Sequence, residues 1–110
     1  MNPVRDIMMY IYIIKSKKNG KLYTGATNNL RNRFKLHNND KVVSTKNNGP
    51  FVLIYYEACI SDGDAFAREK YLKSGMGKRY IKNRLKRFLS LTGWIMNELM
   101  FNLEKIWILI

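Results

Sequence analysis

The sequence predicts a small α+β fold: a three-stranded, mostly antiparallel sheet flanked by helices, with an extra helix at its C-terminal end. Two observations lead to this prediction. The chain has 110 residues, which suits one domain or one domain with a tail. Along that length, residue patterns indicate strand, strand, helix, strand, helix and helix, in that order.

The first two strands are predicted to form a hairpin. Tyr10–Ile14 is rich in β-branched and aromatic residues, as buried strands are. Asn19-Gly20 favours a tight turn because both residues tolerate positive φ. Leu22–Ala26 is the expected second strand. We expect Gly25 to break this strand, and its missing side chain to allow another group to approach closely.

A helix and a third strand are predicted next. The helix covers about residues 29–39 and is capped by one of the polar residues 27–29. Residues 41–50 are polar and rich in turn-forming residues, which indicates a loop. Phe51–Ala58 is nearly all apolar, and we therefore expect it at the centre of the sheet.

Two further helices complete the predicted domain, which spans residues 8–91. The first covers Ala65–Ser74, with Phe66, Tyr71 and Leu72 facing inward. Gly75-Met76-Gly77 is expected to end it. A very basic helix is predicted from Lys78 to about Leu91.

The composition changes at Thr92-Gly93, and residues 92–110 are predicted to form an apolar helical tail. We expect residues 94–110 to pack on the domain, on a second copy of the chain, or on a protein partner. The uninterrupted apolar stretch Ile106–Ile110 is far shorter than the roughly 18 residues that a membrane span needs, so no span is predicted.

The charge balance indicates a polyanionic partner. Twenty Lys and Arg residues against eight Asp and Glu give a net charge of +12, which points to nucleic acid. A membrane-surface or ribosome-associated protein is the alternative. One cysteine and one histidine exclude an internal disulfide and a zinc-binding set. The N-terminus lacks a signal-peptide pattern, so a cytoplasmic, nucleoid-associated protein is expected.

Basic side chains concentrate at two places, where we expect phosphate contacts that position nucleic acid without reading its sequence. Around the predicted hairpin turn they are Lys15, Lys17, Lys18 and Lys21. On the last basic helix they are Lys78, Arg79, Lys82, Arg84, Lys86 and Arg87. For any one of them, ordinary solvation of an exposed surface is the alternative.

Five side chains together match the requirements of phosphodiester hydrolysis: Tyr12, Tyr23, Arg33, His37 and Glu69. Taken singly, each has an ordinary structural explanation, such as strand packing for a tyrosine or a surface ion pair for Glu69. The reaction needs an activated water, a cation on the phosphate oxygens and a positive group on the transition-state charge. A single carboxylate suffices for Mg²⁺, which keeps several waters, and arginine matches phosphate geometry.

The motifs Tyr10-Ile11-Tyr12 and Tyr23-Thr24-Gly25, with Arg33, His37 and Glu69 after them, resemble those of the GIY-YIG endonuclease domain. Tyr12 and Tyr23 are 11 residues apart, and Arg33 follows 10 residues later. Tyr10 departs from the glycine of the family's first motif. The chain looks most like small stand-alone bacterial members, which are similar to the N-terminal nuclease domain of the excinuclease C subunit. The resemblance runs from Met9 to Phe88.

The resemblance implies a role for each residue. Tyr12 would be the general base or position the attacking water, and Tyr23 would contact the water or the scissile phosphate. Arg33 would stabilise phosphate charge, and His37 would bind the phosphate or a tyrosine hydroxyl and help move a proton. Glu69 would hold one Mg²⁺ or Mn²⁺. Asn83 is the candidate for an asparagine after the glutamate, although its offset from Glu69 departs from the family's pattern.

The resulting prediction is a divalent-metal-dependent DNA endonuclease that hydrolyses one strand through a single metal ion. No separate DNA-recognition domain is evident, so a preference for nicked, branched or damaged DNA is expected, in repair or recombination. RNA stays open as a substrate, since phosphate contacts alone do not distinguish the two sugars. One alternative is a non-catalytic nucleic-acid-binding module of the same fold. Another is a membrane- or partner-attached protein built around the tail.

Overall fold

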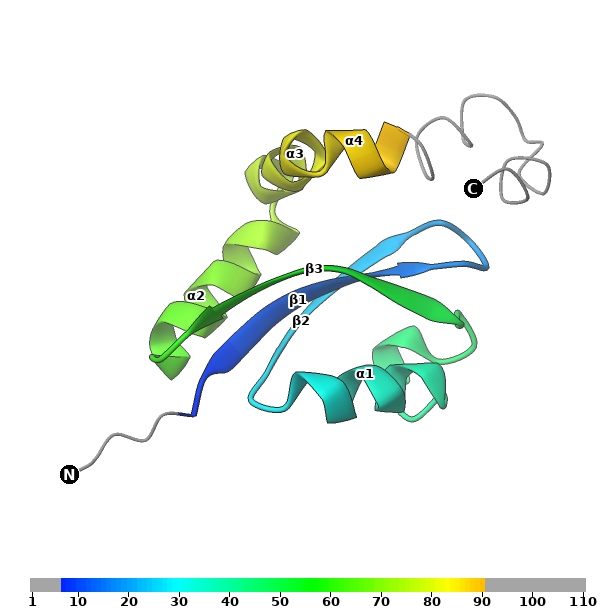
Figure 1. The fold of residues 1–110 in the computed structure, drawn as a ribbon, viewed down its shortest axis with the longest axis horizontal. Helices are drawn as coiled ribbons and strands as arrows, with labels where there is room; N and C mark the ends of the chain where they lie inside the picture. The colour runs from blue at the N-terminus through cyan, green and yellow to red at the C-terminus, as the bar shows by residue number, and fades with distance from the viewer. Residues whose placement is uncertain (1–6, 91–110) are drawn as a thin grey trace. The chain divides into compact units, whose positions relative to one another are not determined.

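A computed structural model of the chain describes residues 7–90 (Figure 1). The predicted tail, residues 92–110, lies outside the described residues. The chain divides into two compact units, Met1–Lys73 and Ser74–Ile110. The first unit holds β1 (Met9–Ser16), β2 (Leu22–Thr27), α1 (Leu30–Asn38), the short 3₁₀ helix η1 (Val43–Thr45), β3 (Phe51–Cys59) and α2 (Asp62–Lys73).

The first unit is built on a three-stranded antiparallel sheet with the strand order β2-β1-β3. The predicted fold class is therefore confirmed. β1 and β2 form the expected hairpin, and Gly20 takes a positive φ of 76° in the turn. Gly25 does not break β2, contrary to prediction, because it pairs with Tyr12 in the middle of the ladder.

The central strand is β1, so the prediction that Phe51–Ala58 lies at the centre was wrong. All but one of the residues of β1 are buried, whereas most of β3 is half-buried or exposed. Pairing on both edges satisfies the backbone of β1, while β3 pairs on one edge only. A run of apolar residues indicates that the faces of a strand are buried, but it does not indicate whether one or two other strands pair with that strand.

The helices α1 and α2 cover opposite faces of the sheet (Figure 1). On the α1 face, Tyr12, Ile14 and Phe51 form a core cluster against which Leu30 and Phe34 of α1 pack. Side chains alternate along a strand, so Ile11 and Ile13 point to the face that α2 covers. The tyrosine at position 12 therefore belongs to the α1 side of the core.

The predicted N-terminal cap of α1 is confirmed, and the prediction for α2 is confirmed in part. Asn29 caps α1 by accepting a hydrogen bond from the Asn32 N–H at 3.1 Å. Helix α2 begins at Asp62, three residues before the predicted start. Leu72 is buried as expected, but Phe66 is 54% exposed and does not face inward.

The described part of the second unit contains α3 (Gly75–Arg84) and α4 (Lys86–Leu89). Helix α2 ends at Lys73, next to the break predicted at Gly75-Met76-Gly77, but these three residues form the first turn of α3, which therefore begins three residues before the predicted Lys78. The reason is Ser74, whose Oγ accepts a hydrogen bond from the Gly77 N–H at 3.1 Å and caps the new helix. The single basic helix that was predicted from Lys78 is interrupted at Leu85. Within residues 7–90, no helix has the length and hydropathy needed to cross a membrane.

Candidate active site

Tyr12 lies at the centre of the candidate site and is almost completely buried, with 2% of its surface exposed. It pairs with Gly25 on β2, and its ring occupies the space over that glycine. A Cβ at position 25 would lie only 2.6 Å from Cζ of Tyr12. The close approach expected at Gly25 is therefore made by the ring of Tyr12.

The imidazole of His37 connects Tyr12 to the loop after α1. The Tyr12 hydroxyl lies 2.7 Å from Nε2 of His37, and Nδ1 of His37 lies 2.8 Å from Oγ1 of Thr45. His37 and Thr45 are 3% and 1% exposed. Burial, and then the positive charge of Arg33, lowers the pKa of His37 to about 4. The imidazole is therefore neutral at physiological pH and can accept a hydrogen bond at one nitrogen.

Arg33 lies one helical turn before His37 on α1, and it acts on the same tyrosine. Burial raises the pKa of the Tyr12 phenol, and the hydrogen bond and positive charge of Arg33 lower it in part. The Nε atom of Arg33 is buried and has no hydrogen-bond partner among the described residues. An unpaired buried donor is costly, which makes this guanidinium a candidate for binding an anionic ligand.

Glu69 lies on α2 and acts on Tyr12 through its charge. Its negative charge raises the pKa of Tyr12, so its carboxylate lies within electrostatic range of the phenol. Oε2 of Glu69 pairs with Nζ of Lys73 at 3.0 Å, and the Lys73 side chain is 56% exposed. Such exposed pairs contribute little stability, so a cation can replace the lysine at small cost.

The site offers one carboxylate rather than a cage of metal ligands. Among residues 7–90, no three His, Cys, Asp or Glu side chains gather closely enough to hold a metal ion. This fits a cation that keeps several of its own waters and shares the phosphate of a substrate, as Mg²⁺ does. It does not fit zinc, which takes three or four protein ligands.

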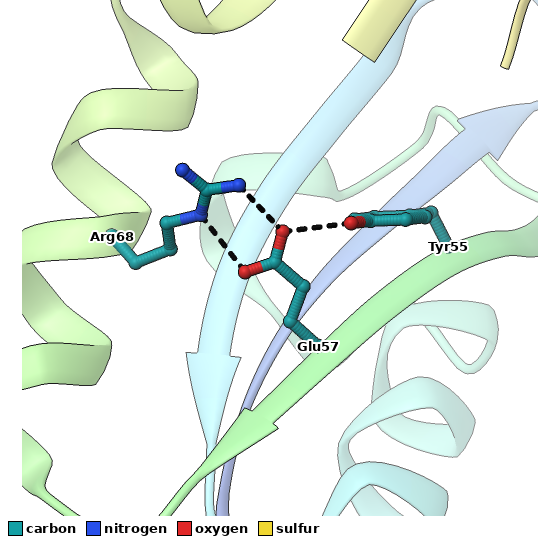
Figure 2. A network of polar contacts seen from close by, with 3 residues as sticks. All are labelled: Tyr55, Glu57 and Arg68. Carbon is teal, nitrogen blue, oxygen red and sulfur yellow. Dashed lines mark hydrogen bonds and ion pairs between the residues drawn. The ribbon is translucent and has the colours of Figure 1, made fainter. Parts of the chain in front are cut away.

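A polar network fastens the helix that carries Glu69 to the sheet (Figure 2). Arg68 donates two hydrogen bonds of 2.8 Å to Glu57 on β3, one to each carboxylate oxygen. The Tyr55 hydroxyl donates a third, of 2.7 Å, to Oε2 of Glu57. The two-pronged contact fixes the rotation of α2, and Glu69 is the next residue along the helix.

Tyr23 lies on the same face as Tyr12 but is held differently. Its ring packs edge-on against Phe51, with 5.7 Å between ring centres. Its hydroxyl accepts a 3.3 Å hydrogen bond from the Asn19 side chain in the hairpin turn. The structure thus joins Tyr12, Arg33, His37 and Glu69 by contact or charge, and it places Tyr23 in the adjoining core cluster.

The predicted basic contacts are mostly exposed, with one correction. Lys17, Lys18 and Lys21 are exposed in the first unit, whereas Lys15 is 5% exposed. Lys15 lies on the central strand between β2 and β3, and burial lowers its pKa, so it does not belong to a phosphate-contacting surface. In the second unit, α3 carries the exposed residues Lys78, Arg79, Lys82 and Asn83.

Thr45 was missed by the sequence analysis. It lies in η1, inside the segment that was predicted to be a loop without structure. Its environment was not visible in the sequence, because a threonine among polar residues is ordinary in a loop. Its partner, His37, was the available signal, since a buried imidazole needs a hydrogen-bonding group at each nitrogen.

Comparison with known proteins identifies the family. The family model described as the GIY-YIG catalytic domain matches residues 8–84. The chain belongs to the GIY-YIG family. Membership places it among nuclease-type domains and implies a nucleic acid as the substrate class.

The similar proteins include small chains of the UPF0213 group. One from Clostridium perfringens is 45% identical over 67 residues, which cover 60% of this chain and 71% of the relative. One from Autographa californica nuclear polyhedrosis virus is 37% identical, covering 68% and 72%. The solution NMR structure of a UPF0213 protein from Bacillus halodurans is 32% identical and covers 69% of this chain and 83% of that one, with a TM-score of 0.45.

Proposed function

We propose that this GIY-YIG chain is a divalent-metal-dependent DNA endonuclease that hydrolyses a phosphodiester bond through one Mg²⁺ or Mn²⁺ ion. The observation that carries the proposal is the contact of Tyr12 with His37 on α1, together with the charges of Arg33 on α1 and Glu69 on α2, which both act on the Tyr12 phenol. A positive group, a proton acceptor and a metal-type carboxylate are the three requirements of the reaction.

Each charged residue has a distinct part in the proposed site. Glu69 would hold the metal ion, which supplies charge stabilisation at the phosphate and lowers the pKa of a bound water. Arg33 would donate from its unpaired Nε, or from the neighbouring terminal nitrogens, to a phosphate oxygen as negative charge develops. Both residues would serve the transition state more than the ground state, so their loss would slow cleavage more than it weakens binding.

Tyr12, His37 and Thr45 would hold and move the proton. Because a guanidinium can only donate hydrogen bonds, the Tyr12 oxygen would accept from Arg33 and the Tyr12 O–H would point to His37. His37 then accepts at Nε2 and donates from Nδ1 to Thr45. Because a pKa of about 4 keeps the imidazole neutral at neutral pH, Nε2 would accept the hydrogen bond of the phenol and help move its proton as the reaction proceeds.

The basic side chains support a preference for structure over sequence. Lys17, Lys18 and Lys21 border the hairpin turn, and the basic residues of α3 are exposed in the second unit. Contacts of this type reach phosphates, which carry no sequence information. We therefore infer nicked, branched or damaged DNA as the preferred substrate, in repair or recombination, inside the cytoplasm and near the nucleoid.

A substrate panel tests the proposal. Full-length protein is incubated with labelled single-stranded, duplex, nicked and branched DNA in Mg²⁺ or Mn²⁺, beside an EDTA control and Arg33→Ala. Cleavage that needs the metal and falls roughly 10²-fold in Arg33→Ala is expected. Binding to every substrate without cleavage of any would instead favour a non-catalytic nucleic-acid-binding module of the same fold.

A further inference from the structure

An open groove lies on the α1 face of the sheet, next to the candidate active site. Its volume is about 520 Å³. Two tyrosines, Tyr10 and Tyr56, contribute aromatic rings, and Arg31 contributes a positive charge. The apolar floor is made by Leu30, Phe34 and Leu53. None of the roles proposed above uses this groove.

The aromatic wall of the groove is exposed. Tyr56 has 54% of its surface exposed, and its ring meets that of Tyr10 edge-on with 5.8 Å between ring centres. An aromatic ring half open to water at the edge of a core is available to stack on a flat ligand. The edge-on partner fixes the orientation of the ring without covering it.

The groove lies beside Tyr12 on the same face of the sheet. Tyr56 pairs directly with Tyr12 across β1 and β3, and Tyr10 lies two residues before Tyr12 on the same face. The floor residues Leu30, Phe34 and Leu53 also pack against the core cluster that contains Tyr12. Two residues along a strand span about 7 Å. Because stacked nucleotides of a duplex rise about 3.4 Å each along one strand, this distance corresponds to about two stacked nucleotides, or one in a more extended strand.

The charge of the groove suits a polyanion. Among residues 7–90, Arg31 is the one charged residue that lines the groove, and no acidic side chain of that range does so. The first turn of α1, which borders the groove, also contains no acidic residue. A stacking ring beside an arginine is a combination that proteins use for single-stranded nucleic acid.

We propose that this groove binds an unpaired nucleobase of the substrate strand, stacked against Tyr56 and Tyr10, while Arg31 contacts a flanking phosphate. The proposal rests on the proposed function and adds to it a substrate class: a strand with at least one unpaired base beside the scissile phosphate. Stacking is tolerant of base identity, so the groove selects for an unpaired base rather than for a sequence.

Binding measurements on variants test the groove separately from catalysis. Affinities of the full-length chain are measured by fluorescence anisotropy in EDTA, where no cleavage is expected. The probes are a thymidine oligonucleotide of about 16 nucleotides and an abasic oligonucleotide of the same length and charge. Tyr56→Ala removes the ring, and Tyr56→Phe keeps it. The control is Phe66→Ala, because Phe66 is also 54% exposed but lies on α2, outside the groove.

The proposal predicts a loss of binding affinity that occurs only when the probe carries bases. Tyr56→Ala weakens binding of the thymidine probe roughly 5- to 100-fold and leaves binding of the abasic probe unchanged. Tyr56→Phe and Phe66→Ala bind both probes like wild type. A uridine oligonucleotide of equal length shows whether the groove also accepts RNA, and weaker binding of it by Tyr56→Ala would support stacking there too.

Two outcomes would overturn the proposal. One is equal weakening, or no weakening, on the thymidine and abasic probes. The other is unchanged binding together with a change in oligomeric state of Tyr56→Ala, which would assign the groove to a second copy of the chain. The groove proposal and the nuclease proposal can fail independently. Base-dependent binding without any cleavage would support the groove proposal and refute the nuclease proposal. Cleavage without base-dependent binding would support the nuclease proposal and refute the groove proposal.

Discussion

The Tyr12 hydroxyl and Nε2 of His37 lie 2.7 Å apart in the interior of the first unit. Both side chains are buried: Tyr12 is 2% exposed and His37 is 3% exposed. A buried phenol–imidazole pair is expensive to maintain unless both groups are fully hydrogen-bonded, and Arg33 and Thr45 supply the remaining interactions. The chain therefore maintains a polar network inside its core, and the charge of the Glu69 carboxylate acts on the phenol of this network.

Thr45→Val is expected to disturb this pair without touching a substrate. It leaves Nδ1 of His37 buried without a partner, which costs about 1–3 kcal/mol of unfolding free energy. Because His37 then loses its fixed orientation, the cleavage rate should fall while substrate affinity is retained. Thr45→Ser, which keeps the hydroxyl, should restore both. Denaturant unfolding and single-turnover kinetics measure the two effects, and a Thr45→Val variant with wild-type stability and rate would contradict the network.

Gly25→Ala should disturb the same site by crowding. The new Cβ would meet the ring of Tyr12, and overpacking of this kind costs about 1–3 kcal/mol. Gly63→Ala is the matched control, because a Cβ there lies 3.6 Å from Oγ of Ser61, an ordinary contact. Thermal unfolding of the two variants should separate them clearly. Equal melting temperatures would show that Tyr12 moves aside freely.

Stability should fall as the pH is lowered from about 6.5 toward 4. The folded pKa of His37, about 4, is below its usual value of 6.5, so in this window the unfolded chain binds a proton that the folded chain does not. Stability is fully present above 6.5 and decreases by about 1.4 kcal/mol for each pH unit below it. His37 is the chain's one histidine, so His37→Gln should flatten the profile measured by urea unfolding. A wild-type profile already flat in this window would rule out the buried neutral imidazole.

Glu57→Gln tests whether the ion pair in Figure 2 positions the helix that carries Glu69. The change weakens the two-pronged contact with Arg68, in which both side chains are less than a third exposed, and should cost about 1–3 kcal/mol. Metal-dependent cleavage should require a higher metal concentration, since α2 is less firmly oriented. Lys73→Ala, which breaks an exposed pair on the same helix, should change stability by less than about 1 kcal/mol. The reverse ranking in denaturant unfolding would be incompatible with this account.

The parts of the fold that local chemistry specifies were predictable. The turn at Asn19-Gly20, the cap at Asn29 and the spacing of Arg33 and His37 on one helix face all follow from short-range rules. The order of the strands was not predictable. An apolar run such as Phe51–Ala58 does not reveal whether it has one neighbouring strand or two, and only the pairing showed that β1 is central.

The site residues that could be predicted are those recognised by residue type and spacing. Residues whose role depends on their burial or on a contact distant in sequence could not be predicted. Tyr12 and His37 were singled out by spacing and resemblance, and the structure joins them. Thr45 acts through a loop contact that leaves no pattern in the sequence. Lys15 resembles its neighbours in the turn but is buried by its place in the central strand. Tyr56 belongs to the run Phe51–Ala58 that was expected at the centre of the sheet, and it is instead 54% exposed.

The most direct test is the single-turnover cleavage rate of Glu69→Gln, compared with Asp64→Asn, an exposed acid on the same helix. Both variants and the wild type are assayed on nicked and single-stranded DNA in Mg²⁺, in Mn²⁺ and in EDTA. The account predicts that Glu69→Gln is slowed roughly 10²- to 10³-fold and still binds DNA, while Asp64→Asn cleaves normally. Cleavage by Glu69→Gln at the wild-type rate, or wild-type cleavage that persists in EDTA, would contradict a single-metal nuclease site built on this carboxylate.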